Sequence, residues 1–124
     1  LILNGIDVFN FSVNEVPENI QKLLQFAKKD RSAIEYFILH QANKLINEGI
    51  RKKLKLQPEQ TPSSLKDFGN TSSATIPLTI VTQIREAITT KPLKMVLSGF
   101  GVGLSWGSMY VDTEGLEVPE LIEV

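Results

Sequence analysis

The sequence predicts an α/β fold: a five-stranded mixed sheet, mainly parallel, packed with helices. Short apolar runs alternate along the chain with stretches in which apolar residues recur every three or four positions, as strands alternate with amphipathic helices. The last two apolar runs are separated only by a short glycine-rich joint, which predicts a C-terminal antiparallel hairpin. A chain of 124 residues is long enough for one domain with its own core.

Five segments are expected to be strands. β-branched and aromatic residues mark the first, and unbroken apolar runs mark the second and the fourth. In chain order the expected strands are 7–13, 36–39, 65–68, 94–100 and 104–111. Helices are expected between the first four strands, so these strands should run parallel with right-handed crossovers.

Three helices are expected between the strands, each with one apolar face. The first begins behind Asn14, has Pro17 in its opening turn, where proline is tolerated, and ends near Lys28. The second begins just after His40 and stops before Pro58. The third spans 73–89.

The two ends of the chain are interpreted separately from this domain, which is assigned to residues 1–112. Residues 113–124 carry acidic but no basic side chains and are expected to form a tail outside the core. The chain opens on Leu1 rather than Met, which predicts a fragment cut from a longer protein.

The composition limits the classes of function. Thirteen basic and fourteen acidic residues give a net charge of −1, which argues against broad nucleic-acid binding and against attachment to an anionic membrane. No apolar run approaches the ~20 residues of a membrane span, and no signal-peptide pattern is present. The chain has no Cys and no cluster with metal-ligand spacing. We therefore expect a cytoplasmic protein without a metal or a resident cofactor.

The only His of the chain follows the strand expected at 36–39 and precedes a helix. Parallel α/β sheets bind ligands at the carboxyl ends of their strands, and this is where His40 is expected to lie. The partial positive charge of a helix N-terminus disfavours imidazolium, so a neutral His40 could donate one hydrogen bond to a developing oxyanion. The alternative is a histidine of the core or of a helix cap.

Asn70 has a similar place in the predicted fold, between the strand expected at 65–68 and the helix expected at 73–89. By itself it is most simply a turn or N-cap residue, because Asn favours both. Together with His40 it predicts a shared site with two neutral hydrogen-bond donors. An enolate formed from a thioester requires donors of this kind.

The run 103–107 matches G-x-S-x-G, the nucleophile elbow of many hydrolases, with Ser105 at its centre. An elbow needs a strand before the Ser and a helix after it, whereas a strand is expected after Ser105. The order is also wrong, because the only His precedes the Ser. We reject the elbow, and a hydrolase that uses Ser105 remains the weakest alternative.

Basic residues gather at 51–53 and at Lys55, where the second helix is expected to end. Favourable interaction with the negative end of the helix dipole is the simpler explanation. A docking patch for an acidic partner is the functional one.

Three motifs resemble the C-terminal half of β-ketoacyl-(acyl-carrier-protein) synthase III, a condensing enzyme with the thiolase fold. They are His40-Gln41-Ala42-Asn43, the block from Gly69 to Ala74 and the block from Gly99 to Gly107. The resemblance runs from about Asn4 to Asp112, and the His-Gln-Ala-Asn and Ser-Trp-Gly sequences separate it from the chalcone synthases. It implies that the α/β domain is a thiolase-like half-domain.

The resemblance implies a Cys-His-Asn triad, of which this chain holds His40 and Asn70 while the Cys lies in the N-terminal half. In such enzymes an acyl group passes from coenzyme A to the Cys, and malonyl-acyl-carrier protein then loses carbon dioxide. His40 and Asn70 hydrogen-bond the thioester oxygen as the enolate forms. The carbanion attacks the acyl-Cys in a Claisen condensation of fatty acid biosynthesis. The chain alone is expected to be inactive.

The resemblance also implies roles in substrate binding. Gly5 and Phe9 match positions at the coenzyme A entrance, and Asn43 matches a position near the pantetheine arm. Phe100 matches an aromatic residue beside the active site. The backbone N–H of Val102 matches an oxyanion-hole donor, although many relatives carry Gly there.

Four partners follow from the resemblance: acyl-carrier protein, an acyl-coenzyme A substrate, the protein's own N-terminal half and a second copy in a homodimer. Lys52 and Lys53 match basic positions that meet the carrier protein, whereas two other such positions are Asn10 and Leu45 here. The alternatives are an acyltransferase of secondary metabolism with the same fold and a non-catalytic half-domain for dimerisation or carrier-protein binding.

Overall fold

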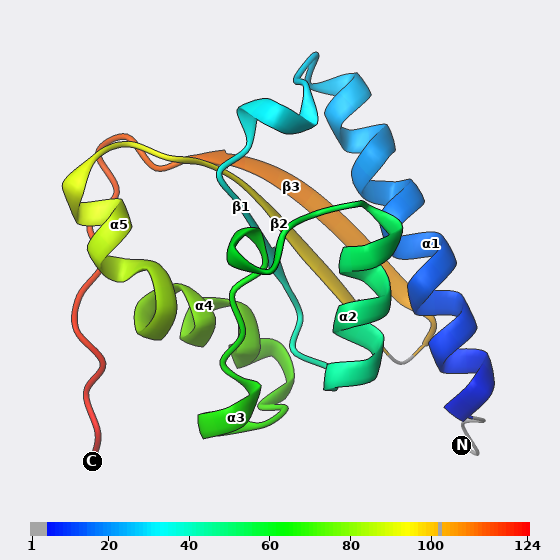
Figure 1. Ribbon diagram of the computed structural model, residues 1–124. Coiled ribbons are helices and arrows are strands. Elements are labelled where there is room, and N and C mark those ends of the chain that lie inside the picture. Colours follow the sequence, from blue (N-terminus) through cyan, green and yellow to red (C-terminus); the bar gives the residue numbers. More distant parts are fainter. Residues whose placement is uncertain (1–4, 102) are drawn as a thin grey trace.

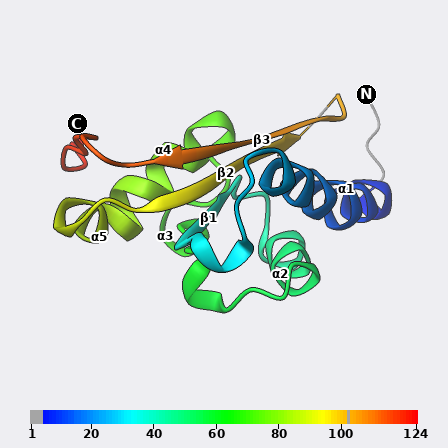
Figure 2. The same cartoon turned by 90° about the horizontal axis from the view of Figure 1, so that it is seen from above.

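The computed structural model describes residues 5–101 and 103–124 and shows an α/β domain. A three-stranded sheet separates α1 and α2 from α4 and α5 (Figures 1 and 2). The helices are α1 (Gly5–Phe26), α2 (Lys44–Lys53), α3 (Leu65–Phe68), α4 (Thr75–Thr79) and α5 (Arg85–Thr90), and the strands are β1 (Tyr36–Leu39), β2 (Lys94–Gly101) and β3 (Ser105–Asp112). No helix within these described residues is long and apolar enough to cross a membrane.

The central strand of the sheet is β2. It pairs in parallel with β1, where Ile38 lies opposite Leu97, and antiparallel with β3, where Phe100 lies opposite Trp106. The parallel pairing and the C-terminal antiparallel hairpin predicted from the sequence are both confirmed. The joint of the hairpin contains Gly103 at a φ of +132°, a conformation that residues with a side chain rarely adopt.

Two apolar cores lie on opposite faces of the sheet. Side chains alternate along β1, so Phe37 and Leu39 point into one core and Ile38 points into the other. The first core is closed by α1 and α2, and its buried members include Val16, Ile20, Ile46, Ile50 and Val96. The second core is closed by the helical segment around α5, with Ile84, Ile88, Leu93 and Met95.

The N-terminal segment is a single helix of 22 residues, so the strand expected at 7–13 and the helix start behind Asn14 are both wrong. Buried positions recur every four residues from Ser12 to Leu24, which gives the helix one face against the first core. Packing of that face outweighs the β-propensity of the first residues. Pro17 therefore lies inside the helix rather than in its opening turn.

The strand expected at 65–68 is also wrong, so the sheet has three strands rather than five. This segment is one helical turn, closed by hydrogen bonds of 3.0 Å from Phe68 N–H to the Ser64 carbonyl and 2.9 Å from Gly69 N–H to the Leu65 carbonyl. Four residues are too few for apolar periodicity to separate a helix from a strand.

The helix expected at 73–89 corresponds to a nearly continuous helical segment from Ser72 to Thr90. Pro77 lies close to its start, where the missing N–H is least costly. A π-helical turn at Ile80–Ile84 divides the segment into α4 and α5. Turns of this kind are rare in helices and are often found near functional sites.

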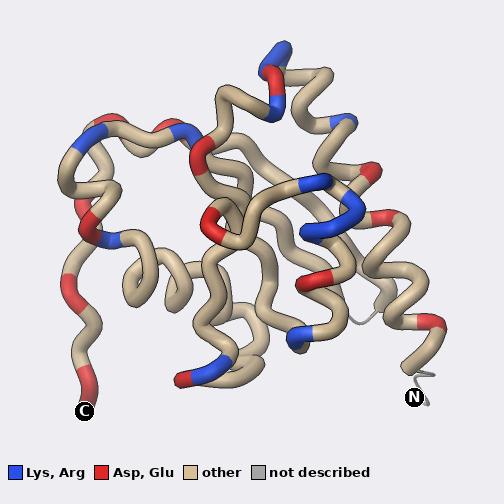
Figure 3. Tube along the Cα trace, in the orientation of Figure 1, with Lys and Arg blue, Asp and Glu red and all other residues tan. Residues whose placement is uncertain are grey.

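The acidic C-terminal segment lies partly in the core, so the expectation of a tail outside it is wrong at two positions. Val118 is buried in the second core, and its carbonyl accepts a 2.9 Å hydrogen bond from Arg85 Nε. Thr113 is also buried and accepts a hydrogen bond from the Leu93 N–H at 2.7 Å. The charged side chains of the segment are all acidic (Figure 3). A domain boundary at residue 112 stays a prediction.

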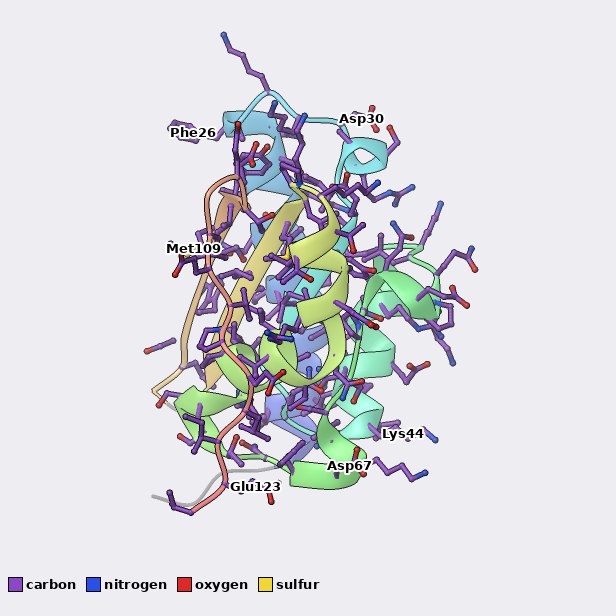
Figure 4. All side chains as sticks on the ribbon, turned by 90° about the vertical axis from the view of Figure 1, so that its left-hand side faces the viewer. Phe26, Asp30, Lys44, Asp67, Met109 and Glu123 are labelled. Carbon is purple, nitrogen blue, oxygen red and sulfur yellow. The ribbon has the colours of Figure 1, made fainter. Side chains whose placement is uncertain are left out.

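The C-terminal hairpin exposes large apolar side chains. Leu104, Trp106 and Met109 are 44%, 44% and 56% exposed. Met109 extends outward from β3 (Figure 4), which is an outer strand of the described sheet. Exposed apolar patches next to a strand edge mark surfaces that other chains or segments cover.

The contact between α1 and α2 depends on Gly49. A Cβ at this position would lie 2.8 Å from Val13 Cγ2 and 3.6 Å from the Phe9 ring, closer to Val13 than side chains allow. Val13 is β-branched and has little freedom to rotate away. Gly49→Ala should therefore lower the free energy of unfolding of the full-length protein by about 1–3 kcal/mol, despite the better helix propensity of Ala. Urea unfolding measures this change.

Gly5→Ala is the matched control, because Gly5 is also helical and no atom of the other described residues lies within 4 Å of its Cβ position. It should leave stability unchanged or slightly higher. If Gly49→Ala is as stable as Gly5→Ala, the helices do not need this close approach.

Candidate active site

His40 and Asn70 lie at one end of the sheet and line the same two adjoining cavities. The His40 N–H donates a 2.8 Å hydrogen bond to the Ser98 carbonyl, which continues the pairing of β1 with β2 by one residue. Asn70 follows α3 on a separate loop. The smaller cavity, of about 150 Å³, and the wider one share His40, Asn70, Phe100 and Gly101 as lining residues. The structure therefore brings together the two residues that were predicted to share a site, and their role stays a prediction.

The His40 ring is held on two sides. Its Nδ1 lies 2.7 Å from the Thr75 hydroxyl oxygen. Its edge meets the Phe100 ring at a centroid distance of 5.3 Å and an interplanar angle of 81°. Partial burial lowers the pKa of His40 below its ordinary value, and a hydrogen bond with the backbone of Ser72 opposes this shift. Burial therefore favours the neutral imidazole, which carries a single N–H.

The neutrality of His40 was expected from a helix N-terminus, and this reason is wrong. Helix α2 begins at Lys44 and is capped by Asn43, whose side-chain oxygen accepts a 2.9 Å hydrogen bond from the Ile46 N–H. His40 lies three residues before that cap. Burial rather than the helix dipole lowers its pKa.

The Asn70 amide has a defined orientation. Its Oδ1 accepts a 2.9 Å hydrogen bond from the Ser72 N–H, so the NH₂ group must be at the other position. Nδ2 donates to the Ala42 carbonyl at 3.3 Å, which leaves a second amide proton for a ligand. Asn70 can therefore stabilise the turn through its Oδ1 and still have an amide proton to donate to a ligand.

The loop around Asn70 needs an unusual backbone. Gly69 has φ +67° and ψ −157°, a combination that is almost restricted to Gly, and Ser72 has a φ of +59°. This backbone brings the Ser72 N–H onto the Asn70 oxygen. The glycine before Asn70 in the motif is thus a conformational requirement.

Two polar side chains that the sequence reasoning missed hold the loop around His40 in place: buried Gln41 ties it to the segment before α3, and half-buried Asn47 ties it to α2. Gln41, 1% exposed, donates to the Leu39 carbonyl at 2.8 Å and accepts from the Ser64 N–H at 3.1 Å. Asn47 donates to the His40 carbonyl at 2.9 Å and accepts from the Ala42 N–H at 3.2 Å. The only feature of the sequence that could have indicated the role of Gln41 is its position directly after His40.

Of the residues expected to bind substrate, Phe100 is the one that the described structure places at this site. Phe100 lines both cavities. Gly5 begins α1 at the surface, and Phe9 packs against the first core. Asn43 lines a different hollow, next to Lys44 and Asn47. Val102 lies outside the described residues. The roles of all five positions stay predictions.

Helix α1 contributes side chains to the small cavity that the sequence did not indicate. They are Val8, Phe11 and Ser12, and Leu104 of the hairpin joins them. They were missed because 7–13 was interpreted as a strand, which would have placed alternate residues on opposite faces. The cavity is therefore mainly apolar, with His40 and Asn70 among its few polar groups.

Lys52 and Lys53 are exposed in the last turn of α2, in a cluster of basic residues visible in Figure 3. The nearby carbonyls already have partners, because the guanidinium groups of Arg31 and Arg51 donate to the carbonyls of Leu54 and Leu56. Arg51 also forms a 2.6 Å ion pair with Glu48. Favourable interaction of the two lysines with the helix dipole and their role in docking both stay predictions.

Two other chemistries were considered from the sequence. Ser105 begins β3 and is followed by strand, so the nucleophile elbow is absent, as expected. It lines a hollow with Gly99 and Trp106 but without His40. Among residues 5–101 and 103–124, no group of three or more His, Asp or Glu side chains is placed to hold a metal ion.

Comparison with known proteins identifies relatives of this chain. Residues 24–113 match the family described as 3-oxoacyl-[acyl-carrier-protein (ACP)] synthase III C terminal. The chain is 42% identical over 109 residues to a beta-ketoacyl-[acyl-carrier-protein] synthase III of Microcystis aeruginosa, covering 88% of this chain and 33% of the relative. It is also 42% identical over 106 residues to a chloroplastic synthase III of Arabidopsis thaliana, covering 86% of this chain and 26% of the relative.

The fold agrees with these sequence matches. The crystal structure of a 3-oxoacyl-(acyl-carrier protein) synthase from Burkholderia xenovorans LB400 superposes with a TM-score of 0.85 at 35% identity, covering 90% of this chain and 32% of that one. The chain thus spans about a third of the length of its relatives. The resemblance inferred from the three motifs is confirmed, and the chain belongs to the family of 3-oxoacyl-[acyl-carrier-protein] synthase III C-terminal domains.

Proposed function

We propose that the full-length protein is a 3-oxoacyl-[acyl-carrier-protein] synthase III that condenses an acyl-coenzyme A with malonyl-acyl-carrier protein in fatty acid biosynthesis. One observation carries the proposal: two neutral donors, His40 and Asn70, line one mainly apolar cavity at the end of the sheet. The names of the relatives support the same activity. This chain supplies only part of the enzyme, because it spans about a third of such proteins.

The decarboxylation step needs what these two side chains offer. When the bond to the carboxylate of the malonyl thioester breaks, carbon dioxide leaves and the electron pair moves onto the thioester oxygen as an enolate. A ring N–H of His40 and the free amide proton of Asn70 donate to that oxygen. Neutral donors in a partly dry cavity stabilise the developing charge without quenching it by proton transfer.

The condensation step needs a nucleophile from elsewhere in the protein. The carbon of the enolate attacks the carbonyl of an acyl-Cys, a carbon–carbon bond forms, and the thiolate of the Cys leaves. This chain has no Cys. The family resemblance assigns the Cys to the N-terminal half, and we expect the chain alone to be inactive. The coenzyme A thioester enters as a substrate rather than as a resident cofactor.

We propose that the substrate and the carrier protein approach the site from the face of the sheet that α1 and α2 cover. Apolar side chains of α1 line the cavity and suit the alkyl part of a pantetheine arm. The family resemblance assigns Gly5 and Phe9 to the coenzyme A entrance and Asn43 to the pantetheine arm. Phe100 flanks the reacting atoms, and the backbone of Val102 donates to the acyl-Cys oxygen. Exposed Lys52 and Lys53 attract an acidic carrier protein.

The exposed apolar side chains of the C-terminal hairpin support a surface that other parts of the full-length protein cover. Trp106 and Met109 are large and apolar, and β3 is an outer strand of the described sheet. We propose that the N-terminal half of the same protein, and a second copy in a homodimer, cover surfaces of this kind. A cytoplasmic location stays a prediction.

Loss of either donor tests the proposal. In the full-length protein, His40→Ala and Asn70→Ala should each lower malonyl-acyl-carrier protein decarboxylation by about 10²–10³-fold, the usual effect of removing an oxyanion donor. Asn70→Asp should be as severe, because it replaces the donating NH₂ with an acceptor of the same shape. Release of carbon dioxide measures the rate.

Ser105→Ala is the control and should keep the wild-type rate, since Ser105 does not line the cavity of His40. Full decarboxylation by both alanine variants would contradict the proposal and favour a non-catalytic carrier-binding domain. An esterase activity that Ser105→Ala removes would favour a hydrolase.

The pH dependence of decarboxylation reports on His40. Burial lowers its pKa below 6.5, so the imidazole resists protonation as the pH falls. The rate should not respond to His40 at neutral pH and should fall only on acidification below 6.5. The residual activity of His40→Gln should lack this acid limb. An acid limb with its midpoint above pH 6.5 that disappears in His40→Gln would show that the folded protein raises the pKa instead.

A further inference from the structure

The hydroxyl of Thr75, at the start of α4, is the nearest polar neighbour of the His40 ring. Its Oγ1 lies 2.7 Å from His40 Nδ1 and 3.2 Å from the backbone nitrogen of Gln41. Thr75 is 0% exposed, so water cannot replace either contact. The direction of each hydrogen bond can therefore be worked out from the protein groups alone.

The hydroxyl proton of Thr75 has one acceptor. The Gln41 N–H can only donate, so the Thr75 oxygen accepts that bond. Among the hydrogen bonds of residues 5–101 and 103–124, His40 Nδ1 is the only group left to accept the proton of Thr75. A buried hydroxyl that donates to nothing is unfavourable, so Thr75 donates and His40 Nδ1 accepts.

Further buried hydroxyls fix Thr75 in place. Thr79 Oγ1 donates to the Thr75 carbonyl at 2.7 Å, which uses its proton. Ser64 Oγ, 2.8 Å from Thr79 Oγ1, therefore donates to it. The Ser64 N–H in turn donates to the Gln41 side chain at 3.1 Å. Ser64 and Thr79 are 1% and 0% exposed, so this chain of hydrogen bonds is dry and has one consistent set of directions.

We propose that Thr75 is a positioning residue that holds His40 in the tautomer with its proton on Nε2. With Nδ1 occupied as an acceptor, Nε2 is the ring nitrogen that carries the proton of the neutral imidazole. The catalytic consequence rests on the proposed function, because only a reaction with a developing oxyanion needs this N–H. The tautomer itself follows from the buried hydrogen bonds alone.

The first experiment observes the tautomer directly. Long-range ¹H–¹⁵N NMR spectra of the full-length protein with ¹⁵N-labelled His distinguish Nε2–H from Nδ1–H rings. The His40 signals are those that disappear in His40→Gln. Wild type and Thr75→Ser, which keeps the hydroxyl, should show the Nε2–H pattern, and Thr75→Val should show a mixture. An Nδ1–H ring in the wild type would overturn the proposal, and this spectrum needs no Thr75 variant to fold.

The second experiment measures decarboxylation. Thr75→Val has nearly the same shape and should lower kcat by about tenfold with little change in KM, as expected for one lost hydrogen bond to a catalytic group. Thr75→Ser should restore the rate. Thr82→Val is the matched control, because its hydroxyl donates to the Leu78 carbonyl at 2.8 Å and accepts from the Gln83 side chain at 3.3 Å, both in the same helical segment. A wild-type kcat and tautomer in Thr75→Val would overturn the proposal.

The two experiments separate failure of this proposal from failure of the proposed function. Full activity of His40→Ala would reject the function, while the wild-type NMR spectrum would still decide the role of Thr75. An Nδ1–H ring in the wild type combined with an inactive His40→Ala would reject the role of Thr75 alone.

Discussion

The buried amide of Gln41 is the contact on which the site depends. It links the carbonyl of Leu39, at the end of β1, to the N–H of Ser64, just before α3. Without it, these two backbone groups would be buried without partners, at a cost of about 1–3 kcal/mol each. The loop that carries His40 and the segment that leads to Asn70 are far apart in the sequence, and this side chain keeps them together.

Contacts with neighbouring groups also fix the orientations of the two donor side chains, His40 and Asn70. The Asn70 amide is oriented by Ser72 and Ala42, and the His40 ring is set by Thr75 and Phe100. Every one of these groups is neutral. Preorganised neutral dipoles stabilise charge that develops during a reaction, and they do so without the desolvation cost of a buried ion. The apolar wall supplied by α1 strengthens the effect by limiting water.

The sequence predicted the parts of the fold that depend on long or distinctive patterns. The buried run at 36–39, the hairpin and the helical segment beyond Ser73 were all correct because periodicity or glycines define them. The errors arose at 7–13 and 65–68, where a β-prone or very short segment is helical through packing and local hydrogen bonds. His40 and Asn70 were predicted because motifs carry them. Thr75 and Ser64 are common residue types, and only the folded chain reveals their partners.

The proposed reaction depends on one interaction: His40 and Asn70 donate to the same oxygen of a bound malonyl thioester. A crystal structure of the full-length protein with a stable malonyl-thioester analogue tests it most directly. We expect the analogue's thioester oxygen within about 2.7–3.2 Å of both His40 Nε2 and Asn70 Nδ2. A thioester oxygen bound elsewhere, or held by only one of these nitrogens, would contradict the account.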